Sequence, residues 1–167
     1  MEEQNLKNIR VMVKCLVGGT VSYNSETRHV RREWTRENQV IPIPADELQE
    51  VLYDQGTYNL FALGYLGIEN PDHRKLVGLE YEGSDRKIIP FTTDMAKHLL
   101  LDEQNLDVFR NKLANLRVGN IEVLVQTAYN LKDISYDKIK IIKEMIGVDI
   151  TNLIRNNDDD DDVQSKK

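Results

Sequence analysis

The spacing of hydrophobic residues changes once along this chain, and that change limits the folds open to it. Near the start, apolar residues recur at every second position: Ile9, Val11, Val13, Cys15 and Val17. A period of two is typical of β-strands. Beyond residue 90 the apolar residues recur at helical spacing, as in the stripe Leu106, Phe109, Leu113 and Leu116. The sequence therefore predicts an α+β fold whose strands and helices occupy different halves.

The first half predicts a small antiparallel β unit with short helices. We expect three or four strands within residues 8–43, followed by a further short strand at 65–68. Gly18 and Gly19 allow a tight reversal, which predicts a hairpin between the first two strands. Pro42 removes a ladder donor and so places its strand at a sheet edge. Short helices are expected after Pro44, ending at Gly56, and from Pro71, ending at Gly78.

The second half predicts a bundle of about four short helices, because isolated short helices are marginal in water and must pack together. Thr92 and Ser135 are candidate N-caps, and Gly147 is a candidate C-terminal stop. We divide the chain into a β-rich unit at 1–79, a connector at 80–90, the helical bundle at 91–155 and a disordered acidic tail at 156–167. The connector is charged and ends in a proline, and the tail lacks any apolar pattern.

The charge of the chain is concentrated in one place. Five consecutive aspartates at 158–162 supply most of the formal net charge of −6, so the rest of the chain is nearly neutral. A nearly neutral body has no general attraction to nucleic acid or to an anionic membrane. The aspartate run itself favours a solvated tail; weak cation binding and docking in a basic groove of a partner remain alternatives.

No catalytic, metal or cofactor site is predicted. Cys15 is the only cysteine, which excludes an internal disulfide and a cysteine-based zinc site. The histidines, His29, His73 and His98, fall in different predicted elements without ligand spacing. We therefore expect a protein that is not an enzyme. The sequence also has neither a signal peptide nor an apolar run of about 20 residues, so we expect a soluble protein that is not secreted and has no membrane partner.

Four arginines around the single tryptophan form the candidate interaction site: Arg28, Arg31, Arg32, Trp34 and Arg36. Such a cluster suits a protein interface, which we favour, or phosphate binding with base stacking. A place in the core is the more expected role for Trp34 itself. Strand alternation puts Arg28, Arg32 and Arg36 on the face of Trp34, and a bulge or strand break near Arg31 would resolve that conflict.

Several segments resemble poorly characterised proteins encoded by tailed bacteriophages. They are residues 13–21 (VKCLVGGTV), 41–48 (IPIPADEL), 60–68 and 143–150 (KEMIGVDI), and the similarity covers about residues 9–154. The resemblance implies a non-enzymatic virion structural or assembly protein in the host cytoplasm and the virion. Its partners would be other phage proteins or further copies of itself. The alternative is a nucleic-acid-binding or transcription-associated accessory protein. The resemblance brings no catalytic residue with it.

Overall fold

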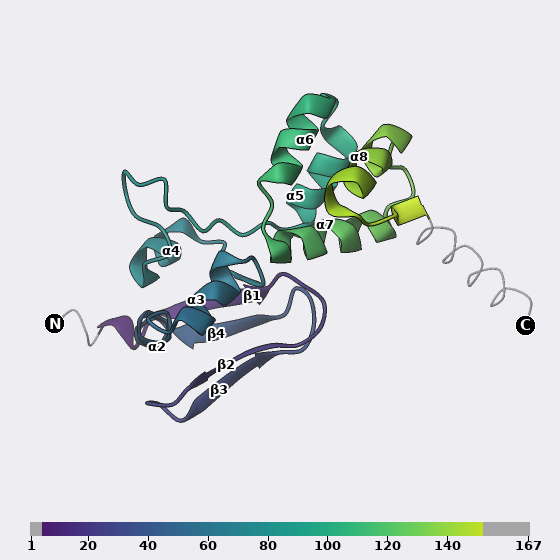
Figure 1. Cartoon of the computed structure of the whole chain (residues 1–167). Coiled ribbons are helices and arrows are strands. Elements are labelled where there is room, and N and C mark those ends of the chain that lie inside the picture. The colour runs from purple at the N-terminus through teal and green to yellow at the C-terminus, as the bar shows by residue number, and fades with distance from the viewer. Residues whose placement is uncertain (1–4, 152–167) are drawn as a thin grey trace, which may run out of the picture. The chain divides into compact units, whose positions relative to one another are not determined.

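The computed structural model describes residues 5–151 and divides the chain into two compact units, Met1–Phe91 and Thr92–Lys167. The first unit contains all the described strands together with short helices, and the second contains helices (Figure 1). The predicted α+β fold is therefore confirmed. The expected acidic tail at 156–167, with its aspartate run, lies outside the described residues.

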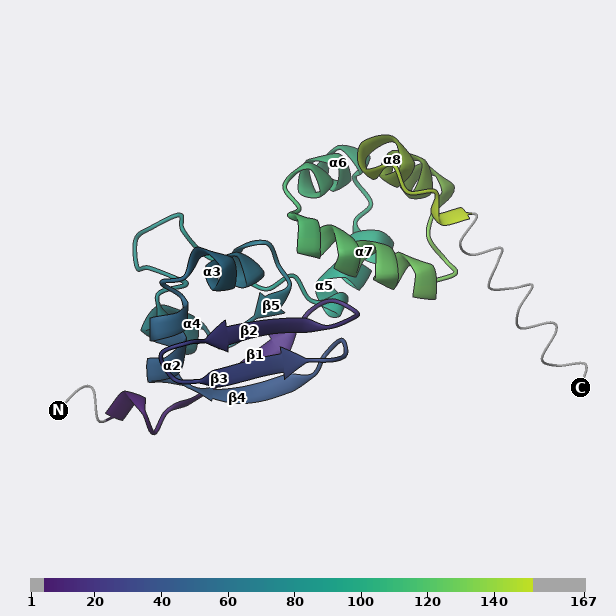
Figure 2. The same cartoon turned by 60° about the horizontal axis from the view of Figure 1, so that its bottom comes forward.

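The strands of the first unit form two antiparallel sheets. One has the order β4-β1-β5, with β1 at Arg10–Cys15, β4 at Val40–Pro44 and β5 at Leu66–Gly67. The other pairs β2 with β3, at Val21–Ser25 and Val30–Trp34. Figures 1 and 2 show the β2–β3 hairpin beside β1 and β4. β4 lies at an edge, so the prediction made from Pro42 is confirmed.

The predicted hairpin at Gly18 and Gly19 is wrong, because β1 pairs with β4 and β5 and not with β2. Gly19 has a φ of 92°, so the glycine pair makes a corner that carries the chain from one sheet to the other. The hairpin lies instead between β2 and β3, around the turn at residues 26–29. The expected bulge near Arg31 is also absent, since the β2–β3 register runs unbroken from Val21 opposite Trp34 to Ser25 opposite Val30.

Three short helices complete the first unit: α2 at Ala45–Val51, α3 at Gln55–Ala62 and α4 at Pro71–Val77. The prediction that Gly56 ends the first of these helices is wrong, because Gly56 lies in the first turn of α3. Asp54 begins that helix, because its carboxylate accepts a hydrogen bond from Thr57 N at 2.8 Å. Gly78 does end α4, in the left-handed conformation with a φ of 84°, as predicted.

Trp34 is the centre of the first unit's core. Its side chain is 0% exposed, and its indole N–H donates to the carbonyl of Val13 at 3.0 Å. The Tyr23 ring packs against it at a centroid distance of 6.0 Å. The indole thus joins the two sheets, which share no strand pairing. Other wholly buried apolar side chains include Val11, Val13, Ile43, Leu48 and Phe61.

Residues 80–90, expected as a connector, belong to the first unit. Glu80 is buried and accepts a hydrogen bond from Arg74 Nε at 2.9 Å. The same arginine donates through Nη1 to the carbonyls of Ile68 and Glu69. Because each charge has its partners, this buried pair can fasten the loop to α4.

The second unit is the predicted helical bundle. Its elements are α5 (Thr93–Lys97), the π-helical turn η1 (His98–Asp102), α6 (Leu106–Ala114), α7 (Val118–Asn130) and α8 (Tyr136–Ile146). Phe109, Leu124 and Ile142 are wholly buried in its core. Thr92 and Ser135 act as N-caps, and Gly147 ends α8 with a φ of 83°, so these three predictions are confirmed.

A buried lysine closes the end of η1. Lys138 of α8 donates from Nζ to the carbonyl of Leu100 at 2.8 Å and lies 5.5 Å from the centre of the Phe109 ring. Burial lowers the pKa of Lys138, while the nearby carboxylates of Glu103 and Asp102 oppose that shift. The ammonium group therefore supplies a donor that the helix end lacks. Among residues 5–151, none of the helices has the length and apolar character of a membrane span.

A test of the packing between β5 and the 80–90 loop comes from Gly67. A Cβ at this position would lie 2.5 Å from Cβ of Pro90, too close for any side chain. We expect Gly67→Ala to lower the free energy of unfolding by about 1–3 kcal/mol, because the loop or strand must shift. Gly18→Ala is the control, since a Cβ there meets nothing within 4 Å. Chemical denaturation of the two variants checks this, and equal stabilities would contradict it.

Candidate functional site: the tyrosine-lined groove

The predicted core role of Trp34 is confirmed, and its burial leaves no ring face on which a base could stack. The arginines around it have different roles. Arg31 is exposed and pairs with Glu33, two residues along the same strand. Arg36 is exposed beyond the end of β3. The structure therefore does not gather the five predicted residues into one binding surface.

Arg32 lies on the face of Trp34 because it has a carboxylate partner there. Its guanidinium donates to both oxygens of Glu47 in α2, at 2.9 and 2.6 Å. The Tyr23 hydroxyl donates to the same carboxylate at 2.7 Å. Burial opposes ionisation of Glu47, but the hydrogen bonds from Arg32 and Tyr23 outweigh it and hold the pKa of Glu47 below its ordinary value. This contact joins β2, β3 and α2.

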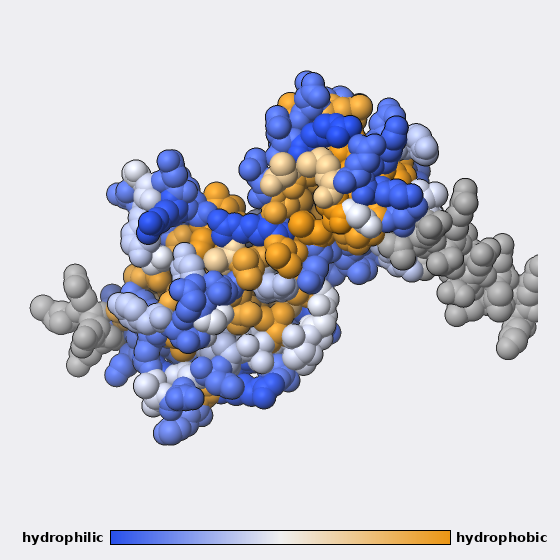
Figure 3. Space-filling view, in the orientation of Figure 1, coloured by the Kyte–Doolittle hydropathy of each residue, from blue (hydrophilic) through white to orange (hydrophobic). Residues whose placement is uncertain are grey.

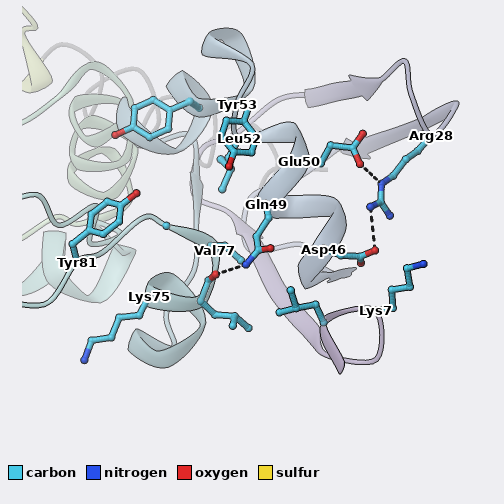
Figure 4. A pocket seen from close by; sticks show the side chains of 14 residues that line it. Lys7, Arg28, Asp46, Gln49, Glu50, Leu52, Tyr53, Lys75, Val77 and Tyr81 are labelled. Atoms are coloured by element: carbon cyan, nitrogen blue, oxygen red, sulfur yellow. Dashed lines mark hydrogen bonds and ion pairs between the residues drawn. The ribbon is translucent and has the colours of Figure 1, made fainter. Parts of the chain in front are cut away.

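Arg28 lies in the turn of the β2–β3 hairpin and links that turn to α2. Its Nε donates to Glu50 at 2.8 Å and its Nη2 to Asp46 at 3.0 Å (Figure 4). The Thr27 hydroxyl donates to Glu50 as well. The hydrogen bonds from Thr27 and Arg28 lower the pKa of Glu50, so this carboxylate is ionised at neutral pH. Two carboxylates thus share one guanidinium.

A groove of about 1020 Å³ opens beside these ion pairs, between α2 and α4. Figure 4 shows α2 along it, with Arg28 on one side and Lys75 and Tyr81 on the other. We call it the α2–α4 groove. Its lining residues are Leu6, Lys7, Arg28, Asp46, Gln49, Glu50, Leu52, Tyr53, Tyr58, Lys75, Leu76, Val77, Gly78 and Tyr81.

The polar floor of the groove comes from one face of α2. Asp46, Gln49 and Glu50 stand at i, i+3 and i+4, which places them together on a helix surface. Gln49 Nε2 donates to the carbonyl of Leu76 at 2.7 Å and so fixes α2 to the end of α4. Among residues 5–151, Asp46 Oδ1 is the only buried side-chain oxygen or nitrogen without a hydrogen-bond partner.

Tyrosines provide the aromatic part of the groove. Tyr53 is 92% exposed and Tyr81 is 56% exposed, so these rings bury little area in the chain by itself. Tyr58 is half-buried and lines the groove as well. Sequence reasoning missed this site. A signal for it was present, because Tyr53 follows Asp46, Gln49 and Glu50 at helical spacing.

The histidines and the cysteine lie elsewhere. His29 is exposed in the β2–β3 turn, His73 lies in α4, and His98 of η1 pairs with Asp102. Cys15 is buried, and burial raises the pKa of its thiol. In the part of the chain that the structure describes, no group of three or more His, Cys, Asp or Glu side chains could hold a metal ion.

The Glu47 contact predicts a pH-dependent stability. Because the folded pKa of Glu47 lies below its ordinary value of 4.5, its stabilising effect is complete above pH 4.5 and is lost as the pH falls through the folded pKa. We expect Glu47→Gln to reduce the free energy of unfolding at pH 7 by roughly 2–3 kcal/mol, since Arg32 loses its charged partner.

The difference between wild type and Glu47→Gln should shrink as the pH is lowered below 4.5, as measured by chemical denaturation at several pH values. Glu26→Gln is the control, because Glu26 is exposed in the hairpin turn and should have little effect at any pH. A deficit in Glu47→Gln that stayed constant down to pH 3 would contradict the assignment.

The α2–α4 groove and the ion pairs of Arg28 beside it are therefore the candidate functional site, and they combine exposed aromatic rings with fixed charges. Comparison of the chain with protein-family models, with curated proteins and with solved structures finds no match.

Proposed function

We propose that this chain is a non-enzymatic component of a tailed bacteriophage, structural or for assembly, which acts through protein–protein contacts. We place its main contact surface at the α2–α4 groove. The phage assignment depends on the resemblance of the segments within residues 9–154, and the contact role depends on the groove. The partners would be other phage proteins in the host cytoplasm or in the virion.

The observation that carries the contact role is the exposure of Tyr53 and Tyr81 on the same groove. Tyrosine and arginine are enriched where protein interfaces gain most of their binding energy, and a tyrosine side chain loses little conformational entropy when it is buried. Aliphatic side chains that line the same groove, Leu52 and Leu76, add apolar area. A partner that covered these rings would remove them from water at small ordering cost.

The frame of the groove is also held in place before any partner binds. Arg28 ties the hairpin to α2, and Gln49 ties α2 to α4. Fixing a surface in its binding geometry reduces the entropy cost of association. Hydrophobic residues also reach the surface elsewhere in the chain, where Figure 3 shows them gathered into patches among hydrophilic residues.

The phage role can be tested in purified particles and assembly intermediates from infected cells, analysed by mass spectrometry. We expect the chain in one or both at a stoichiometric level. A protein that is abundant in infected cells but absent from both fractions would overturn the structural and assembly role.

The contact role predicts the effect of removing the two rings. The double variant Tyr53→Ser/Tyr81→Ser should weaken association with the particle or its assembly intermediate by about thirtyfold, the effect of a loss of about 2 kcal/mol. Fold should be retained, because both rings are exposed. The measurement is the fraction of chain that co-sediments with the intermediate across a concentration series.

Tyr136→Ser is the matched control, because Tyr136 is 75% exposed but lies on α8 in the second unit. It should bind as wild type does. If the double variant associates as tightly as this control, the groove is not the contact surface.

A further inference from the structure

We propose that β2 binds an extended, positively charged segment of a partner protein, which adds to the β2–β3 hairpin as a third strand. The segment occupies a second groove, of about 550 Å³, which is lined by β2, the end of α2 and α3. We call it the β2–α3 groove. It is separate from the α2–α4 groove, apart from Glu50, which lines both. The inference therefore does not depend on the contact role proposed for Tyr53 and Tyr81.

β2 has one strand neighbour and one open edge. It pairs with β3 along its whole length, from Val21 to Ser25, in a sheet of two strands. In an antiparallel pair every second residue directs its N–H and C=O groups toward the neighbour, so the residues between them direct theirs away from it. In the described part of the chain, no other segment forms a backbone hydrogen bond with β2. An extended peptide can supply the missing partners by adding to this edge.

The edge of β2 lacks the features that protect exposed strands from pairing. Proteins protect such edges with prolines, charged side chains or bulges. β4 carries Pro42 and Pro44, and β3 carries three successive charged residues at 31–33. β2 has the sequence VSYNS, without proline or charge, and its register with β3 contains no bulge. Of these three strands, β2 thus has the edge best suited to pairing.

The β2–α3 groove lies along this edge. Its lining includes four consecutive residues of β2, at 22–25, together with Leu60 of α3. Because successive side chains of a strand point to opposite faces, a groove lined by consecutive residues follows the edge of the strand. In Figures 1 and 2, β2 is the strand of the hairpin nearer to α3. A third strand therefore has space beside β2.

The borders of the groove are fixed before a partner binds. Tyr23 of β2 donates to Glu47 of α2, which holds the strand against that helix. Asp54 caps α3 through Thr57. Binding to a surface that is already in its final geometry reduces the entropy cost of association.

The charges of the groove select a basic occupant. Glu26, Glu50 and Asp54 are lining residues, and the lining contains no lysine, arginine or histidine. Arg28 pairs with Glu50. Asp54 accepts from the N–H and hydroxyl of Thr57, which carry no charge, and Glu26 is exposed in the turn. Lysine or arginine of a partner can pair with these two carboxylates, whereas a second copy of β2 would bring like charges together.

The first test uses a blocked peptide of about ten residues in which lysine alternates with valine, so that one face is basic and the other can contact Val51 and Leu60. We expect the full chain to bind it below about 1 mM, and to bind a glutamate–valine counterpart about tenfold more weakly. Fluorescence anisotropy of labelled peptides gives both affinities.

Two methylated peptides test the strand pairing itself. One carries N-methyl groups on its valines and the other on its lysines, so each lacks the N–H donors along one edge. An added strand bonds to β2 through one edge only. One methylated peptide should therefore bind about tenfold more weakly than the parent peptide, and the other should bind within about threefold of it. The bound parent peptide should also slow hydrogen exchange at the β2 amides that face away from β3.

Substitutions in the chain test the charge selection. Glu26→Gln/Asp54→Asn should weaken binding of the lysine–valine peptide about fivefold, the effect of losing two exposed ion pairs. Asparagine still caps a helix, so α3 should be retained. The control Glu122→Gln/Asp133→Asn changes the net charge equally at exposed positions of the second unit and should bind as wild type does.

Any one of four results would overturn the inference. They are no binding of the lysine–valine peptide at about 1 mM, equal affinities of the two methylated peptides, binding that leaves hydrogen exchange in β2 unchanged, and equal affinities of Glu26→Gln/Asp54→Asn and its control. None of these measurements involves Tyr53, Tyr81 or a phage particle, so their failure leaves the proposed contact role of the α2–α4 groove untouched.

Discussion

The carboxylate of Glu47 is the contact on which the first unit depends. It accepts hydrogen bonds from Arg32 on β3 and from Tyr23 on β2, while its own backbone belongs to α2. The two sheets share no strand pairing, so side chains must join them. Trp34 does so through the core, and Glu47 ties the β2–β3 sheet to α2 through charge. Because the carboxylate is buried and fully partnered, losing it leaves Arg32 without its counter-charge.

This contact also sets the position of the candidate site. With Ala45, Leu48 and Val51 of α2 buried and Glu47 held by Arg32 and Tyr23, helical geometry turns Asp46, Gln49 and Glu50 toward the groove. Arg28 then closes the hairpin onto that side, and Tyr53 extends from the end of the helix. The same helix thus closes the core with one face and forms the floor of the α2–α4 groove with the other. The seven residues of α2 therefore contribute both to the stability of the first unit and to the surface proposed for binding.

The arginine cluster shows why a site of this kind is hard to find from sequence. Arginines near a tryptophan suit an interface, a phosphate site or an internal ion pair equally well. What distinguishes these roles is the partner, and the partners of Arg32 and Arg28 lie 15 to 22 residues further along the chain. Tyr53 and Tyr81 differ from the arginines, because the sequence around them led to no predicted site. They look like ordinary aromatic residues in sequence, and only their exposure on a common groove distinguishes them.

The sequence by itself determined what depends on near neighbours. The change of hydrophobic period predicted the α+β division, Pro42 predicted an edge strand, and Thr92, Ser135, Gly78 and Gly147 predicted helix ends, because caps and ladders are local contacts. Tertiary structure decided what depends on distant residues. The glycine pair at 18 and 19 allows a hairpin, yet β1 pairs with β4, where their apolar residues can share one buried face. The groove, too, exists only because α2, α4 and the hairpin turn meet in space.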